Sequence, residues 1–176
     1  LLADQLALSI VRVTQRTKIG RSISLDTGLV KHTKNALPFQ LTGAQEVALK
    51  EILSDMAEPY RMLRLLQGDV GSGKTVVAFL AMLRAVESGA QAALMAPTEV
   101  LAQQHYNTLK PIADHMGVEV AILTGKDPKS YRKQILSELS TGKISIIVGT
   151  HALFQEDVIY KDLALAVIDE QHRFGV

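Results

Sequence analysis

Cysteine is absent from the 176-residue chain, which excludes a disulfide scaffold and any metal site built on thiolate ligands. No apolar run reaches the ~20 residues that a membrane-spanning helix needs, and no basic-then-apolar leader opens the chain. An excess of one sign of charge is also lacking, because the chain has 19 Lys and Arg residues and 18 Asp and Glu residues. Bulk charge therefore does not indicate a nucleic-acid binder, although it leaves room for a local basic groove. We expect a cytoplasmic protein with no membrane partner.

Hydrophobic residues make up 47% of the chain, enough for a sizeable core. Apolar runs that we predict to be strands cover residues 62–67, 92–96, 119–125, 144–150 and 163–170. They alternate with predicted helices at residues 42–56, 74–89, 98–117 and 129–142, the first with Thr42 as N-cap. We expect Pro111 to kink or end the third helix. This alternation predicts an α/β fold with a mostly parallel sheet and helices on both faces.

The first 36 residues differ in pattern from the rest. Apolar residues at positions 3, 6, 7, 10, 11 and 13 predict an amphipathic helix, and a mixed polar stretch follows it as far as Pro38. We interpret residues 1–36 as a helical connector from an upstream domain and residues 37–176 as the main domain. The chain begins without Met and stops just after a charged cluster, so we expect it to be a piece of a longer polypeptide.

The stretch GDVGSGKT matches the pattern G-x-x-x-x-G-K-[ST] in full. Its residues are Gly68, Asp69, Val70, Gly71, Ser72, Gly73, Lys74 and Thr75. The glycines allow successive N–H groups to turn inward as an anion nest, and the N-terminus of the next helix adds partial positive charge. Lys74 supplies a charge for the β- and γ-phosphates, and the Thr75 hydroxyl can ligate Mg²⁺. A turn that merely needs glycine is the alternative, but the position between a predicted strand and a predicted helix favours a nucleoside triphosphate site.

Two acids, Asp169 and Glu170, end the last predicted strand. Residues at the carboxyl end of a parallel strand project into the crevice where ligands bind. Asp169 can hold Mg²⁺ there, usually through water, and Glu170 can polarise the attacking water. A solvated strand cap is the alternative for such a pair. Its place downstream of the glycine loop favours nucleotide hydrolysis, with Lys74, Asp169 and Glu170 as the catalytic residues.

Together, GDVGSGKT and DEQH resemble the superfamily 2 helicases, and more closely the RecG-type ATP-dependent DNA helicases. The resemblance covers residues 38–176 and implies a RecA-like P-loop domain that uses ATP and Mg²⁺. Within LPFQLTGAQ it implies that Gln45 reads the adenine edge, with Phe39 either nearby or in the core. It also implies that Gln171 and His172 of DEQH couple the ATP site to the bound DNA.

Three further stretches, APTEVLAQQH, LTGK and VGTHALFQ, resemble the segments with which these helicases contact one DNA strand. The residues implied are Thr98, Thr124, Gly125, Lys126, Gly149 and Thr150. All lie just past predicted strands, and their hydroxyls, N–H groups and single lysine suit phosphate contacts. Loop chemistry and helix capping are the alternative for each of them. We interpret His105 and His151 as structural or capping residues.

The resemblance implies a motor that acts on branched or forked DNA, such as stalled forks and Holliday junctions, in recombination and repair. It also implies a second motor domain and an upstream wedge domain in the same polypeptide. The transcription–repair coupling translocase is an alternative, although Gln171 and the Pro97-Thr98-Glu99 stretch depart from its usual motifs. A non-translocating nucleotide switch and an inactive remnant are further alternatives. The absence of a guanine-reading N-K-x-D stretch and the upstream position of Gln45 argue against the switch. The intact Lys74, Thr75, Asp169 and Glu170 argue against the remnant.

Overall fold

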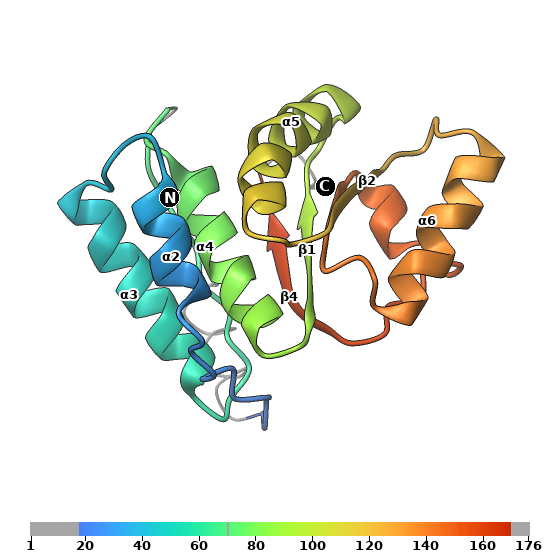
Figure 1. Ribbon diagram of the computed structural model, residues 1–176. Coiled ribbons are helices and arrows are strands. Elements are labelled where there is room, and N and C mark those ends of the chain that lie inside the picture. Colours follow the sequence, from blue (N-terminus) through green and yellow to red (C-terminus); the bar gives the residue numbers. More distant parts are fainter. Residues whose placement is uncertain (1–17, 70, 170–176) are drawn as a thin grey trace, which may run out of the picture.

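The computed structural model describes residues 18–69 and 71–169. A four-stranded parallel sheet in the order β2-β3-β1-β4 forms its centre (Figure 1). The strands are β1 (Gln91–Met95), β2 (Val120–Leu123), β3 (Ile146–Gly149) and β4 (Leu163–Ile168). The helices are α2 (Leu29–Ala36), α3 (Gly43–Ala57), α4 (Lys74–Glu87), α5 (Glu99–His115) and α6 (Lys129–Thr141), with a 3₁₀ turn η1 (His151–Phe154). Within these described ranges, no helix combines the length and apolar character that crossing a membrane requires.

Helices cover both faces of the sheet, as predicted. Successive strand residues point to opposite faces, so Ala92 and Leu94 join one core cluster and Ala93 and Met95 join the other. The first cluster includes residues of α3, α4 and α5, and the second includes residues of α6 and η1. All residues of β1, β2 and β3 are buried, as expected for parallel strands covered on both sides. The sheet therefore separates two cores.

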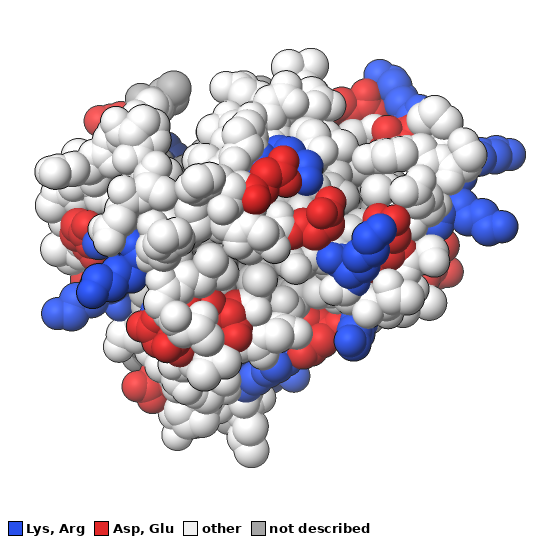
Figure 2. Space-filling view, viewed as in Figure 1, with Lys and Arg blue, Asp and Glu red and all other residues white. Residues whose placement is uncertain are grey.

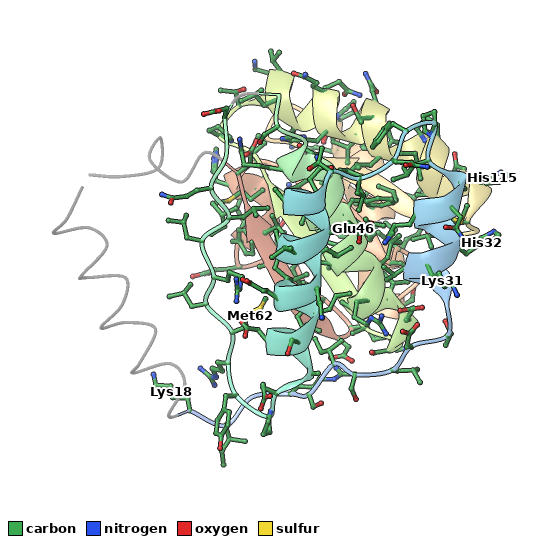
Figure 3. All side chains as sticks on the ribbon, turned by 90° about the vertical axis from the view of Figure 1, so that its left-hand side faces the viewer. Lys18, Lys31, His32, Glu46, Met62 and His115 are labelled. Carbon is green, nitrogen blue, oxygen red and sulfur yellow. The ribbon has the colours of Figure 1, made fainter. Side chains whose placement is uncertain are left out.

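The predicted strand at residues 62–67 is wrong, because the described structure assigns no strand there. The segment still alternates between partly buried and exposed residues, as its apolar pattern suggests. Met62 packs on the core cluster of α3 and α4, beside which Figure 3 shows it. Arg64 forms ion pairs with Glu51 and Asp55 of α3, at 2.7 and 2.8 Å. Side-chain contacts with α3, not a backbone ladder, therefore hold this segment.

Pro111 lies inside α5 and does not end it, since the helix continues to His115. Leu109 and Ala113, on either side of the proline, are buried in the core. Their burial on the sheet outweighs the single backbone hydrogen bond that a proline removes.

The segment before the main domain contains a helix, α2, where we predicted a mixed polar stretch. Val30 and Thr33 of α2 are buried, and the helix lies against α4. Figure 3 shows α2 beside α3, where Lys34 of α2 pairs with Glu46 of α3 at 2.6 Å. The amphipathic helix predicted earlier in the connector falls on residues 1–17, outside the described residues. The domain division at residues 36 and 37 remains a prediction.

A buried carboxylate ties this upstream segment to the end of α4. The Glu87 side chain is 0% exposed, and its Oε1 accepts hydrogen bonds from the Thr27 amide, the Thr27 hydroxyl and the Leu29 amide at 2.6–3.2 Å. Arg84 Nε lies 3.3 Å from Glu87 Oε2, an ion pair without hydrogen-bond geometry. The Arg84 guanidinium also donates to the Leu25 carbonyl and the Asp26 carboxylate. The segment is therefore anchored to α4 by Arg84 and Glu87, two charged side chains that water scarcely reaches.

We predict that Glu87→Ala destabilises the chain by about 3–5 kcal/mol, because it leaves the donors of Thr27 and Leu29 without their acceptor and Arg84 without the opposite charge of its ion pair. The matched control is Lys143→Ala, which breaks the exposed Lys143–Glu138 pair and should leave stability almost unchanged. Urea unfolding followed by circular dichroism measures both. Equal stability of the two variants would contradict the anchoring role of Glu87.

Candidate active site

The glycine loop lies directly before α4 and turns through two left-handed residues. Gly71 and Gly73 have φ angles of 81° and 78°, a region that residues with a Cβ rarely adopt. Gly73 is the N-cap of α4 and has no side chain with which to cap the helix. The free N–H groups of the first turn are therefore available to an anion.

Lys74 folds back over this loop. Its Nζ donates to the Gly68 carbonyl at 2.6 Å and to the Asp69 carbonyl at 2.8 Å. Both partners are neutral, and a charged phosphate oxygen is a stronger acceptor for an ammonium group. Lys74 is thus placed at the loop, in contacts that a phosphate can replace.

Gln45 connects the start of α3 to the loop. Its side-chain Oε1 accepts from the Thr42 backbone amide at 2.8 Å, and its backbone amide donates to the Thr42 hydroxyl at 3.3 Å. This capping box confirms Thr42 as the N-cap of α3. The Gln45 Nε2 also donates to the Ser72 carbonyl at 2.8 Å. Recognition of adenine by Gln45 remains a prediction, and the structure places the side-chain amide of Gln45 against the phosphate loop.

Asp169 follows β4 and is held from two sides. Its amide donates to the Met95 carbonyl at 2.8 Å, which extends the pairing between β4 and β1. One carboxylate oxygen, Oδ2, lies 2.7 Å from Nε2 of His105 on α5. The other candidate residues of this motif, Glu170, Gln171 and His172, lie outside the described residues.

His105 is the residue at this site that the sequence analysis missed, because we interpreted it as structural or capping. A signal was available in the spacing of α5. His105 comes three residues after Ala102 and four before Leu109, both of which are buried against the sheet. It therefore lies on the sheet-facing stripe of the helix.

The residues present fit a magnesium ion that is shared with a nucleotide. The described parts of the chain contain no group of three or more His, Cys, Asp and Glu that could form a protein cage for a metal. Mg²⁺ is usually bound through one or two carboxylates together with substrate phosphates. Asp169, directly after β4, and Thr75, in the first turn of α4, carry oxygen atoms of the kind that such a site needs, and their binding of Mg²⁺ remains a prediction.

The strand ends bring most of the predicted DNA-contact residues to one edge of the sheet. Leu123, Gly149 and Met95 are paired at the ends of β2, β3 and β1, and the segments that follow them carry the predicted contacts. Gly149 and Thr150 are packed inside, since a Cβ on Gly149 would lie 2.1 Å from the Leu123 carbonyl and Thr150 is 4% exposed. Their DNA contacts remain predictions.

Three of the predicted DNA-contact residues already have partners within the chain. The Thr98 hydroxyl caps α5 by accepting from the Leu101 amide, and the Thr124 amide donates to Asp127. Lys126 is 84% exposed and pairs with Glu99 at 2.9 Å. An incoming phosphate would therefore compete with two carboxylates for Thr124 and Lys126.

A shallow groove of about 670 Å³ runs between α5 and the loop after β2. Its lining residues are Glu99, Val100, Gln103, Gln104, Asn107, Thr108, Ile122, Thr124 and Asp127. Tyr131 of α6 donates to the carbonyl of Ile122, one of these lining residues, and burial raises the pKa of the Tyr131 phenol. Acidic and basic side chains are interspersed on the face shown in Figure 2. Any DNA contact here therefore depends on individual groups more than on a broad positive field.

Comparisons with known proteins agree with this geometry. A family model described as DEAD/DEAH box helicase matches residues 42–176. The "ATP-dependent DNA helicase RecG" of Haemophilus influenzae is 48% identical over all 176 residues, and that of Bacillus subtilis is 55% identical over 141 residues, 80% of this chain. The chain spans about a quarter of the first protein (25%) and 21% of the second.

Solved structures show the same similarity. A structure described as "Structure of RecG bound to three-way DNA junction" has a TM-score of 0.83 and 45% identity, and the match covers 97% of this chain and 24% of that one. A hypothetical ATP-dependent RNA helicase from Sulfolobus tokodaii matches with a TM-score of 0.61 at 22% identity, over 83% of this chain and 42% of its own, and supports the fold alone. The predicted RecA-like fold and the resemblance to RecG-type helicases are both confirmed.

We predict that Gly73→Ala impairs ATP binding, because the new Cβ would lie 2.3 Å from Nε2 of Gln45 and would strain a φ of 78° by about 1–2 kcal/mol. The control is Gly142→Ala, which has the same strain at a φ of 81° but meets only the flexible Lys161 side chain, at the end of α6. Isothermal titration calorimetry should find weaker ATP binding for Gly73→Ala alone. Equal affinities of the two variants would contradict the role of the loop.

Proposed function

Because the chain belongs to the DEAD/DEAH box helicase family, we propose that it is the first motor domain of an ATP-dependent DNA helicase that remodels branched DNA. The branched substrates that we propose are stalled forks and Holliday junctions, in recombination and repair. The expected cytoplasmic location belongs to the same proposal.

The observation that carries this proposal is that the glycine loop before α4 and Asp169 after β4 lie toward the same end of the sheet. Figure 1 places the start of α4 and the carboxyl ends of β1 and β4 toward the same end of the molecule. In the proposed role, the loop amides and Lys74 bind the phosphates of ATP, and Thr75 and Asp169 hold Mg²⁺. When bound there, Mg²⁺ would supply positive charge to offset that of the phosphates, and Glu170 would orient and polarise the attacking water.

The DNA part of the proposal is supported by the relatives. The solved relative with 45% identity is described as bound to a three-way DNA junction. The segments after β1, β2 and β3 would contact one strand of such DNA, through Thr98, Thr124, Gly125, Lys126, Gly149 and Thr150. Gln171 and His172 would couple the ATP site to that strand.

The remaining parts of the machine would come from the rest of a longer polypeptide. The chain spans 25% of the Haemophilus influenzae relative, which leaves length for a second motor domain and an upstream wedge domain. P-loop motors use an arginine from outside the loop, worth ~10³–10⁵ in rate, and we place that arginine on the second motor domain. The relatives named above are RecG proteins, which favours this function over the transcription–repair coupling translocase.

The proposed activity is tested with Glu170→Gln in the full-length protein. Glutamine keeps the size of the side chain but removes the carboxylate that assists water, so forked-DNA-stimulated ATP turnover should fall by ~10²-fold or more. Binding of MgATP should stay close to that of the unmutated protein, whereas Lys74→Ala should weaken binding itself. A steady-state ATPase assay and a binding assay measure the two effects. Normal turnover in Glu170→Gln would refute the assignment.

A second test concerns the base. If Gln45 reads the adenine edge, Gln45→Ala should reduce the preference for ATP over GTP by ~1–3 kcal/mol, the value of one hydrogen-bonded contact. Thr42→Ala is the control, because it removes the capping hydroxyl of α3 and leaves the Gln45 amide in place. The ratio of kcat/KM for ATP and GTP reports the effect. Equal use of both nucleotides by the unmutated protein would exclude this role.

A further inference from the structure

The contact between His105 and Asp169 joins two parts of the domain that the proposed function treats separately. His105 belongs to α5, which begins directly after Thr98, and Asp169 ends β4. Their side chains meet at 2.7 Å and are 12% and 27% exposed. Since a carboxylate can only accept a hydrogen bond, Nε2 of His105 must carry the hydrogen.

The contact restrains the one part of Asp169 that the sheet leaves free. The backbone of Asp169 is fixed by its hydrogen bond to Met95, so its side-chain rotamer is the remaining freedom. His105 binds Oδ2, and among the described residues Oδ1 has no hydrogen-bond partner. An imidazole on one oxygen therefore sets the direction in which the other oxygen points.

The same helix carries the predicted DNA side of the site. Thr98 caps its N-terminus, and Glu99 in its first turn pairs with Lys126 from the loop after β2. His105 follows Thr98 by seven residues, about 10 Å along the helix axis. Helix α5 therefore carries predicted DNA contacts at its N-terminus and the contact with Asp169 about two turns further along.

We propose that His105 is a positioning residue for Asp169. It holds the carboxylate in the orientation that binds Mg²⁺ together with nucleotide, and it links that orientation to the position of α5. This inference rests on the proposed function for the identity of the ligand. It adds His105 as the residue through which a movement of α5 on DNA binding would reach the ATP site. Residues behind metal ligands of this kind typically change metal affinity 10–100-fold when they are replaced.

The test uses the full-length protein and a fluorescent ADP analogue, measured first in EDTA and then over a Mg²⁺ titration. His105→Leu keeps a side chain of similar bulk and removes the donor, whereas His105→Gln keeps an N–H donor. His115→Leu is the matched control, because His115 lies on the same helix, is exposed, and is labelled in Figure 3. Melting temperatures report whether each variant folds.

We expect His105→Leu to raise the Mg²⁺ concentration at half-saturation by about 10-fold or more, with nucleotide affinity in EDTA changed by less than about two-fold. His105→Gln should recover most of the Mg²⁺ affinity, and His115→Leu should match the unmutated protein. Forked DNA should also stimulate the ATPase of His105→Leu less than that of His105→Gln.

Two results would overturn the inference. One is an unchanged Mg²⁺ half-saturation in His105→Leu. The other is an equal loss of stability and of EDTA-resistant nucleotide binding in both His105 variants, which would make His105 a packing residue. A failure of the proposed function looks different, because the unmutated protein would then show no DNA-stimulated ATPase while the Mg²⁺ titration would still report on His105.

Discussion

The parallel pairing of four strands brings Leu123, Gly149, Met95 and Ile168 into one row at the carboxyl edge of the sheet. A slip of one residue in any pairing would turn that strand's side chains to the opposite face. The two buried cores oppose such a slip, because Ala92 and Leu94 belong to one and Ala93 and Met95 to the other. Asp169 and the predicted DNA-contact loops therefore share an edge as a consequence of burial.

Helix α4 is held at both ends. Its first residue, Lys74, lies on the phosphate loop, and its last residue, Glu87, accepts hydrogen bonds from Thr27 and Leu29. Gln45 adds a third connection, from the start of α3 to the loop. Under the proposed function, a change at the phosphates would thus reach the upstream segment through one short helix, with buried charged groups at its far end.

Much of the fold was predictable from sequence, because parallel strands that are buried on both faces appear as continuous apolar runs, and the phosphate loop has a strict pattern of residues. The strand predicted at residues 62–67 was wrong, because the alternating side chains of this segment pack on α3 and the described residues contain no strand paired with it. Helix α2 was missed because its burial depends on α4, which local composition does not show. The bond from His105 to Asp169 needs the packing of α5 on the sheet, although the spacing of His105 from Ala102 and Leu109 indicated its face.

The central claim is that the loop before α4 holds the phosphates of ATP. In the present structure, Lys74 Nζ is bonded to the Gly68 and Asp69 carbonyls. The most direct measurement is a crystal structure of the protein with Mg²⁺ and a non-hydrolysable ATP analogue. The account predicts that the phosphates occupy the loop, that Nζ leaves both carbonyls for the phosphate oxygens, and that Asp169 faces the ion. Nucleotide bound elsewhere, or a Lys74 still bonded to the loop carbonyls beside bound phosphates, would contradict it.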